Sequence, residues 1–543
     1  MNKKNLILLI ARSSGSKFVS RQNLRLVNGK PLIYYSIKKV LEFKNGELVV
    51  STDSEEIKEL SESYGANVIR RPKSLIKDST SLEEVAFDAL DRLKKNGKVF
   101  QKCLILSPHF PTISTKTIDK FFTQLSNNRE TIFGYEDTSD QVYFYAKKIS
   151  NESNRIIPLE NKTLEMKKII SFKCKNFYKN NHFNEPFFCL KIPSNEIFYP
   201  KNYHEYGVLE NILNKKRILV RVDGDKTMGL GHVYNMLTVL NNLRNQEILI
   251  VMNSKKSLGK EKFLEYIYNI VTFRSQEQLF KIIDNFKPDV ILNDILNTEL
   301  IYMKKLKKYA RKIINFEDLG NGKKYADLII NPIYYKKNPK KNEFFGSKYA
   351  CVRDEFRLWQ KKSCNTEVSQ IVISFGGTDP KNNTLKILNL LYKIKNKEIK
   401  IKVIIGIGNN CLNKIETLVK IMKKDGFSVE TIKNSDFLAK HISESDFAII
   451  SNGRTSFEVA SVKVPILAIA VNKRELDHSF VEKSKIGFIS ILNNKNDEKK
   501  VEKLILKMLD YKIRKEHHRN LSKINVLDGV NIVNKLILKE ISN

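Results

Sequence analysis

The sequence predicts an α/β fold made of several doubly wound parallel sheets. Apolar runs rich in β-branched residues alternate with segments of helical period along all 543 residues, which is the pattern of successive βα units. At roughly 100–200 residues per domain, this length holds two to four domains, each with its own core. No short internal repeat accompanies the pattern, so a solenoid is not indicated.

The first domain is expected to cover residues 1–214. Its opening strands are "LILLIA", "ELVVSTD" and "KCLILSP", and helical periods follow in "LIYYSIKKVLEF", "SEEIKELSESYG" and "TSLEEVAFDALDRLKK". The apolar run near the start spans only Leu6 to Ile10, which is shorter than the roughly 7–15 residues of a signal-peptide core. A buried first strand is therefore the better interpretation. Near Asn214 to Lys216 a helix ends in basic residues and a new strand begins, which predicts the domain boundary.

Two further doubly wound domains are expected, over residues 217–360 and 361–543. The first set of strands is "ILVRVDG", "EILIVMN", "DVILNDI", "KIINFED" and "DLIINP"; the second is "SQIVISFGG", "IKVIIGIG", "SDFAIISNG" and "VPILAIAVN". Ligands of such sheets bind at the carboxyl ends of the strands. The two domains are thus predicted to enclose a ligand crevice.

Composition excludes several classes of protein. A hydrophobic fraction of 41% argues against disorder, and the absence of an 18-residue apolar run argues against a membrane span. The six cysteines form no close pair, so neither a zinc site nor a disulfide framework is indicated, and a cytoplasmic location fits. The net charge of +35 is spread through nearly every segment, which favours attraction for phosphate-bearing substrates over a specific nucleic-acid site.

The turn "DGDKTMGLGH" follows the first strand of the second domain and opens a helix. Gly229 and Gly231 allow a ligand to approach the backbone, and the helix start offers free N–H groups to a phosphate. His232 lies in the first turn of that helix and is a candidate general base, because a histidine of ordinary pKa accepts a proton at neutral pH. The alternative is an incidental histidine on a glycine turn. Asp223 either orients the histidine or its water, or only forms the turn.

Three comparable features end strands of the third domain. Gly376 and Gly377 follow the strand in "ISFGGTDP", and "AIAVN" ends in Asn472. The third feature is "IISNGRTSFE", whose Glu458 falls about one turn into the next helix, where a carboxylate can accept hydrogen bonds from a ribose. Its other candidate ligand residues are Ser451, Asn452, Gly453 and Thr455. Together these features predict a nucleotide-binding half that faces a catalytic half.

Residues 217 to about 490 resemble the GT-B-fold UDP-sugar hydrolases of pseudaminic acid biosynthesis. The likeness is carried in collinear order by "RVDGDKTMGLGH", "DVILND", "INFEDLGNGKKYADLIINP", "YACVRDEF", "SFGGTDP", "SNGRTSFEVASVKVP" and "VN". It implies that His232 is the general base, that Ser451 to Thr455 hold the diphosphate and Glu458 the ribose, and that Asn472 is an active-site asparagine. Arg353 of "YACVRDEF" joins the implied nucleotide-sugar site. The family usually has an arginine where this chain has Asn235.

The chemistry that this resemblance implies is an inverting hydrolysis that needs no metal. Glycine-loop N–H groups stabilise the UDP leaving group, while the histidine activates water on the opposite side of the anomeric carbon. Two other hypotheses stay open. In the first, the GT-B half is a glycosyltransferase in which His232 activates an acceptor hydroxyl; in the second, it is a non-catalytic scaffold that binds a nucleotide.

The first domain carries a different signature, "ARSSGSKFVSRQNLRLVNGKPL". Backbone N–H groups and cations gathered at one loop suit a nucleoside triphosphate, although a lysine-rich turn would look the same. The segment resembles the cytidylyltransferases that activate nonulosonic acids as CMP-sugars. That likeness implies CTP, a nonulosonic acid, Mg²⁺ if the domain is active, and a homodimer, as is frequent in that family. The implied CTP-binding residues are Arg12, Ser14, Gly15, Ser16, Lys17, Asn23 and Lys30.

Departures from the cytidylyltransferase pattern bear on activity. The family holds Mg²⁺ with aspartates near the end of the domain, where this chain offers only Glu205 and Glu210. Phe18 replaces a loop glycine, and "SPHFPTI" replaces the family's substrate segment. With few hard oxygen ligands available for a metal, a degenerate domain kept for binding or dimerisation is favoured over an active one. Both resemblances indicate nonulosonic acid biosynthesis.

Overall fold

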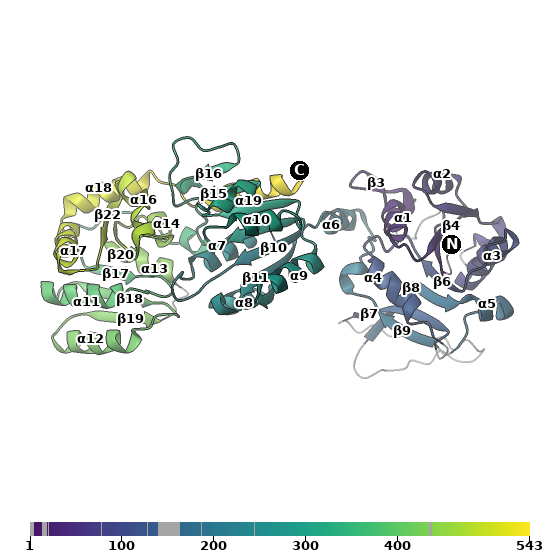
Figure 1. Cartoon of the computed structure of the whole chain (residues 1–543), viewed down its shortest axis with the longest axis horizontal. Helices are drawn as coiled ribbons and strands as arrows, with labels where there is room; N and C mark the ends of the chain where they lie inside the picture. Colours follow the sequence, from purple (N-terminus) through teal and green to yellow (C-terminus); the bar gives the residue numbers. More distant parts are fainter. Residues whose placement is uncertain are drawn as a thin grey trace. The chain divides into compact units, whose positions relative to one another are not determined.

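The computed structural model describes residues 5–13, 19, 21–77, 79–126, 129–138, 163–185, 187–243, 245–433 and 437–542. The chain divides into two compact units, Met1–Asn214 and Lys215–Asn543. Each unit is built from β-strands covered by α-helices (Figure 1). The predicted α/β class is confirmed in both.

The first unit contains one seven-stranded mixed sheet. β1 pairs in parallel with β4 and β6, whereas β8 is antiparallel to β6 and β7. The strand order is β5 (Asn67–Arg70), β4 (Glu47–Thr52), β1 (Asn5–Ile10), β6 (Lys102–Leu106), β8 (Thr163–Lys173), β7 (Thr131–Thr138) and β9 (Phe187–Lys191). The helices are α1 (Leu32–Glu42), α2 (Glu55–Ser63), α3 (Leu82–Lys95), α4 (Thr115–Thr123), α5 (Cys174–Asn180) and α6 (Tyr203–Leu213), and a small hairpin pairs β2 (Leu26–Val27) with β3 (Lys30–Pro31).

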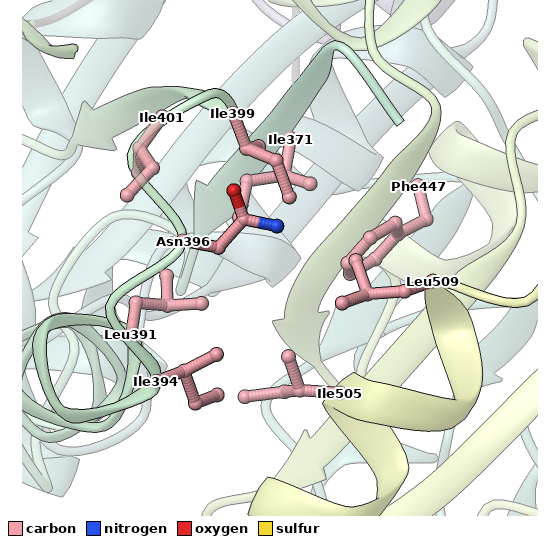
Figure 2. Close-up of a pocket in the computed structure, with 9 residues that line it drawn as sticks. All are labelled: Ile371, Leu391, Ile394, Asn396, Ile399, Ile401, Phe447, Ile505 and Leu509. Carbon is pink, nitrogen blue, oxygen red and sulfur yellow. The ribbon is translucent and has the colours of Figure 1, made fainter. Parts of the chain in front are cut away.

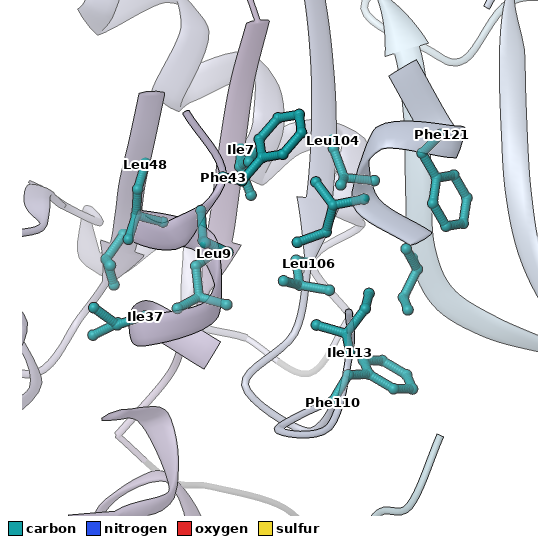
Figure 3. Packing of buried hydrophobic residues seen from close by; sticks show 14 of the residues in the cluster. Ile7, Leu9, Ile37, Phe43, Leu48, Leu104, Leu106, Phe110, Ile113 and Phe121 are labelled. Carbon is teal, nitrogen blue, oxygen red and sulfur yellow. The ribbon is translucent and has the colours of Figure 1, made fainter. Parts of the chain in front are cut away.

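The main core of the first unit lies between the sheet and helices α1 and α4. Ile7 and Leu9 of β1 pack there with Leu104 and Leu106 of β6, and Phe121 of α4 joins them (Figure 3). Strands β1 and β6 are buried on both faces, which explains why they read as continuous apolar runs rather than as alternating ones.

The second unit begins with a fully parallel seven-stranded sheet, here called the first lobe. Its order is β12 (Asn269–Phe273), β11 (Glu247–Asn253), β10 (Arg217–Val222), β13 (Val290–Asp294), β14 (Lys312–Phe316), β15 (Leu328–Asn331) and β16 (Glu343–Phe345). The helices between these strands are α7 (Gly231–Leu240), α8 (Lys260–Glu265), α9 (Gln276–Phe286) and α10 (Leu300–Leu306).

A second, six-stranded parallel sheet forms the second lobe. Its order is β19 (Val429–Lys433), β18 (Lys400–Ile405), β17 (Gln370–Ser374), β20 (Phe447–Ser451), β21 (Ile466–Ala470) and β22 (Gly487–Ile491). The helices that follow its strands are α11 (Asn383–Ile394), α12 (Leu412–Lys424), α13 (Leu438–Ser443), α14 (Thr455–Ser461), α15 (Lys473–Leu476), α16 (Phe480–Lys483), α17 (Lys495–Met508), α18 (Tyr511–Ser522) and α19 (Gly529–Ser542).

In each lobe the strand order reverses beside the first strand of the sheet. The reversal falls between β10 and β13 in the first lobe and between β17 and β20 in the second. Crevices open at such points, outside the carboxyl ends of the strands. Two doubly wound lobes in succession make the GT-B arrangement that the sequence predicted.

The last helix does not stay with the lobe to which the sequence assigned it. α19 packs on α7 and β14 of the first lobe, and Figure 1 shows it, at the yellow end of the chain, among the elements of that lobe. Its apolar residues Val533, Ile537 and Ile541 belong to the core around β10. The strands of the two sheets thus lie on opposite sides of residue 361 in the sequence, whereas α19 follows both sheets and has its apolar partners in the first lobe.

A small cavity in the second lobe is a packing gap rather than a ligand site. It lies at the amino ends of β17, β18 and β20, among side chains such as Ile371, Ile401 and Phe447 (Figure 2). Its volume of about 10 Å³ is roughly the room that one water molecule needs, and it faces away from the carboxyl ends of the strands. Within the described ranges, no helix is both long enough and apolar enough to cross a membrane.

Candidate active site between the two lobes

His232 stands at the strand-order reversal of the first lobe. The chain leaves β10 at Val222, turns through Gly229, which has a φ of +82°, and begins α7 at Gly231. A positive φ suits glycine because it has no Cβ. The turn sets His232 at the start of α7 with only 6% of its surface exposed, beside the carboxyl end of the sheet.

Asp294 is the partner of His232. Asp294 ends β13 and lies in register with Val222, the last residue of β10. Its Oδ1 is 2.6 Å from His232 Nδ1, and Asn235 Nδ2 donates a hydrogen bond to its Oδ2 at 2.7 Å. Asn235 lies one helical turn after His232, so α7 holds this carboxylate through two side chains of one face. Asp294 is a site residue for which the sequence alone predicted no role.

The surroundings of Asp294 fix its charge and, through it, the tautomer of His232. Burial alone would raise the pKa of Asp294, but the charges of His232 and Arg454 and the hydrogen bonds from His232 and Asn235 outweigh burial, and the net pKa is lowered. An ionised carboxylate can only accept hydrogen bonds, so Nδ1 of His232 must carry the proton. In the neutral imidazole the lone pair then lies on Nε2, which can act as a base.

Asp223 does not orient His232 in the structure. Both of its carboxylate oxygens accept hydrogen bonds from the Arg221 guanidinium, at 2.6 and 2.7 Å, and Oδ1 also accepts one from the Asn253 N–H at 3.0 Å. Arg221 is a buried cation near the carboxyl end of β10, and it needs a carboxylate close by. The orienting role expected of Asp223 is therefore corrected to Asp294, and Asp223 is placed in a buried ion pair.

The glycine turns of the two lobes are in contact. A Cβ added to Gly377 would lie 2.9 Å from Leu230 Cδ1, and one added to Gly229 would lie 3.7 Å from Thr378 Oγ1. Gly376 has a φ of +72°, which a residue with a side chain adopts only under strain. The predicted glycine positions thus sit where backbone from one lobe closely approaches the other.

Two predicted ligand residues hold loops of the second lobe together. Asn452 Nδ2 donates to the carbonyl oxygens of Glu475 and His478, at 2.7 and 3.0 Å. Asn472 caps α15 by accepting the Glu475 N–H at 3.0 Å. Asn452 therefore joins the loops after β20 and β21, which sets the path of the predicted diphosphate segment, whereas the contact of Asn472 lies within the loop after β21.

The rest of that segment lies at the end of β20 and the start of α14. Ser451 is the last residue of the strand, Gly453 accepts a hydrogen bond from the Ser456 hydroxyl at 2.7 Å, and Thr455 begins the helix. A Cβ on Gly453 would meet only Glu475 and Ser451, at 3.8 and 4.0 Å. Through the side chain of Arg454 this segment also adjoins the turn of His232, since a Cβ added to Gly231 would lie 3.4 Å from Arg454 Cδ.

Glu458, expected on the ribose, is paired with Arg353. The Arg353 Nε donates to Glu458 Oε1 at 2.9 Å, and its guanidinium lies over the ring of Tyr234 at 4.9 Å. Tyr234 is on α7, and Glu458 is on α14. The structure therefore brings these two predicted residues together, and through them the connecting segment contacts both lobes.

In the first unit, the predicted CTP-binding residues are described in part. Ser14, Gly15, Ser16 and Lys17 lie outside the described residues. Asn23 is buried, and its Nδ2 donates to the Arg12 carbonyl oxygen at 3.0 Å. Lys30 is exposed, with its ammonium 5.7 Å from the centre of the Tyr34 ring.

Sequence reasoning missed a contact beside these residues. Asp53, which follows β4, accepts hydrogen bonds from the Ser13 N–H and hydroxyl at 2.8 and 2.5 Å. Because β1 and β4 are paired in parallel, residues after both strands meet at one edge of the sheet. The aspartate that ends "ELVVSTD", just after a predicted strand, was the feature of the sequence from which this contact could have been predicted.

The residues expected at a Mg²⁺ site in this unit do not fit one. The Glu205 carboxylate accepts hydrogen bonds from the Lys201 N–H at 2.7 Å and from Asn202 Nδ2 at 2.9 Å. Glu210 Oε1 accepts the Asn28 N–H at 3.0 Å. Both carboxylates therefore hold the chain around α6. Across the described part of the chain, no cluster of three or more His, Cys, Asp or Glu residues could hold a metal.

Comparisons with known proteins cover both units. Residues 6–195 match the family model of cytidylyltransferases. An uncharacterised protein of Methanocaldococcus jannaschii is 30% identical over 286 residues, which make up 49% of this chain and 58% of that protein. The chain thus spans little more than half of this relative. The pseudaminic acid cytidylyltransferase of Campylobacter jejuni is 29% identical over 163 residues, covering 29% of this chain and 68% of the relative.

A Helicobacter pylori relative has two activities in its name. It is called pseudaminic acid cytidylyltransferase and UDP-2,4-diacetamido-2,4,6-trideoxy-β-L-altropyranose hydrolase, and it is 22% identical over 428 residues, covering 74% of this chain and 77% of that protein. Because this match is longer than either unit of the present chain, it includes residues of both.

Proposed function

We propose that the chain acts in nonulosonic acid biosynthesis. The premise is that residues 6–195 form a cytidylyltransferase-family domain, which is joined to a GT-B unit. In this proposal the second unit hydrolyses a UDP-linked diacetamido-trideoxy sugar to the free sugar and UDP. The name of the Helicobacter relative supports the substrate class. The observation that carries the proposal is the hydrogen bond of 2.6 Å between His232 and Asp294 at the carboxyl ends of β10 and β13.

His232 Nε2 would take the proton of the attacking water. As the water oxygen forms its bond to the anomeric carbon, the bond from that carbon to the diphosphate oxygen breaks, and UDP leaves with the electron pair. A single displacement inverts the anomeric centre. Asp294 would hold the imidazole in the required tautomer and stabilise the imidazolium that forms, since a carboxylate behind a histidine has both effects.

The second lobe would bind the leaving group through backbone. N–H groups of the Gly376–Gly377 turn and of the segment Ser451–Gly453 are candidates for the diphosphate, because donors fixed in place stabilise developing negative charge without reorganising. This binding requires no metal.

The proposal is tested with the UDP-sugar alone. The full chain should release UDP and free sugar in equal amounts without an acceptor, and His232→Gln should abolish release while UDP binding survives. Turnover that requires an added acceptor would contradict hydrolysis and indicate a glycosyltransferase. Nucleotide binding without turnover, in both the parent and the variant, would indicate a scaffold.

For the first unit we propose nucleotide binding without metal-dependent transfer. The support is the family membership of residues 6–195 together with the engaged carboxylates of Glu205 and Glu210. CTP, Mg²⁺ and a nonulosonic acid are supplied together, and pyrophosphate is measured. CTP binding without pyrophosphate release supports the proposal, whereas release of pyrophosphate at a steady rate overturns it.

A further inference from the structure

Arg454 reaches from the second lobe to the partner of the candidate base. It precedes α14, and its Nη2 lies 3.4 Å from Asp294 Oδ2 and 3.5 Å from Asp294 Oδ1. The same nitrogen is 3.0 Å from Glu317 Oε1, as an ion pair rather than an aligned hydrogen bond. One side chain of the second lobe thus touches two carboxylates at the carboxyl ends of the neighbouring strands β13 and β14 of the first.

The stem of Arg454 packs against the turn that carries His232. A Cβ added to Gly231, the residue before His232, would lie 3.4 Å from Arg454 Cδ. The guanidinium therefore faces the carboxylate that holds the imidazole, while the methylene groups support the backbone from which the imidazole extends. Both contacts depend on the second lobe being in place.

The charges around this contact are buried and unequal in number. Asp294 is fully buried and Glu317 is 3% exposed, and Arg454 is the guanidinium within 4 Å of both. Two carboxylates facing one guanidinium leave one negative charge that this guanidinium does not neutralise. Arg454 is thus a third donor at the Asp294 carboxylate, beside His232 and Asn235.

The backbone conformation and the contacts of Glu317 indicate that the second lobe packs directly on this part of the first lobe. Its φ of +52° is in the left-handed region, where a non-glycine residue stays only if its surroundings hold it. Arg474 of the second lobe donates to the Glu317 carbonyl oxygen at 3.0 Å. Arg454 and Arg474 thus bind one residue, but Arg474 reaches its backbone and the Tyr334 hydroxyl instead of Asp294.

We propose that Arg454 is a positioning residue for His232, supplied by the opposite lobe. Arg454 holds Asp294 and the turn of Gly231 in fixed positions relative to each other, so that His232 is correctly placed as a base only when the two lobes are together. This inference rests on the proposed hydrolysis for its kinetic consequence, while its structural consequence can be measured without turnover.

The test compares Arg454→Met with the matched variant Arg474→Met in the full chain. Both remove a guanidinium that crosses between the lobes, but only Arg454 touches Asp294. Misplacing a catalytic group by about 1 Å can cost roughly 100-fold, so kcat of Arg454→Met should fall about 10- to 100-fold with KM little changed. Arg474→Met should keep kcat within about threefold of the parent, because the contacts of His232 are intact.

A second readout follows the imidazole directly. The Nδ1 proton of His232, assigned by its loss in His232→Gln, is followed by NMR. Its exchange with solvent should be faster in Arg454→Met than in the parent and unchanged in Arg474→Met. If Arg454→Met does not fold, Glu317→Gln loosens the same guanidinium while keeping the shape of its partner, and it should show the same two changes to a smaller degree.

The outcomes separate the two proposals. If the parent does not turn over UDP-sugar but Arg454→Met accelerates the exchange, the proposed function fails and the positioning role stands. If the parent turns over and Arg454→Met changes neither kcat nor the exchange, the inference is overturned. A higher KM at unchanged kcat also overturns it, because that result makes Arg454 a contact of the diphosphate.

Discussion

Replacing Asp294 with asparagine removes the charge behind His232 while keeping the shape of the side chain. The carboxylate has donors on three sides: His232 Nδ1 at 2.6 Å, Asn235 Nδ2 at 2.7 Å and Arg454 Nη2 at 3.4 Å. An amide offers one oxygen and one NH₂ group. If the NH₂ group of the new asparagine faces His232, Nδ1 must accept its hydrogen bond, so Nε2 carries the proton and the base is lost. If the NH₂ group faces Asn235 instead, it and Asn235 Nδ2 are two donors that point at each other.

The expected size of the effect follows from that contact. A hydrogen bond to a charged group is worth about 1.5–3 kcal/mol, which corresponds to roughly a 10- to 150-fold change in rate. We expect kcat of Asp294→Asn to be lower than that of the parent by a factor in that range, with little change in UDP affinity. Initial rates of UDP release at saturating UDP-sugar measure kcat, and calorimetry measures the binding of UDP. A folded Asp294→Asn protein whose kcat stays within about threefold of the parent would refute the reasoning.

Four further predictions concern the same unit. Asp223→Asn breaks a buried pair with Arg221 and should lower the free energy of unfolding by about 3–5 kcal/mol, measured in urea, with kcat affected less than by Asp294→Asn. Gly377→Ala places a Cβ 2.9 Å from Leu230 and should lower stability by about 1–3 kcal/mol through overpacking, seen as a lower urea midpoint. Burial alone would raise the pKa of Asp446, but its lysine and backbone hydrogen bonds outweigh burial and lower it. Its contribution to stability is therefore complete above about pH 4 and is lost as the pH falls further, so the difference in unfolding free energy between the parent and Asp446→Asn should shrink in acid. EDTA should leave the rate of UDP release unchanged, since the proposed hydrolysis uses no metal; a rate restored only by added Mg²⁺ would contradict that.

The sequence was sufficient for the central strands of each sheet, such as β1, β10 and β17, and for the position of His232. It did not predict the antiparallel part of the first unit around β7, β8 and β9, nor the outer strands β5, β12, β16, β19 and β22. Strands buried on both faces read as continuous apolar runs, and the glycine turn after β10 marked the edge of the sheet where a site forms. What the sequence could not supply was the partner of the histidine. Asp294 is 62 residues away, and it meets His232 only because β13 pairs with β10. A polar residue at the carboxyl end of a buried strand was the available signal.

The sequence also contained a signal that Asp223 pairs with Arg221 instead of orienting His232. Arg221 lies in β10, two residues before Asp223, and the alternation of side chains along an extended chain places the two on the same face. A buried arginine in a strand requires a carboxylate, and Asp223 was the carboxylate within reach. The lobe to which α19 belongs had no comparable signal, because an amphipathic pattern shows that a helix is covered but not by which element.

Hydrolysis in H₂¹⁸O tests most directly the claim that His232 activates water for attack on the anomeric carbon. The full chain is given UDP-2,4-diacetamido-2,4,6-trideoxy-β-L-altropyranose in labelled water, and both products are analysed by mass spectrometry, with His232→Gln as the control. We expect one ¹⁸O in the free sugar, none in UDP, and no labelled sugar from the variant. Label in the phosphate of UDP, or labelled sugar formed at the parent rate by His232→Gln, would contradict it.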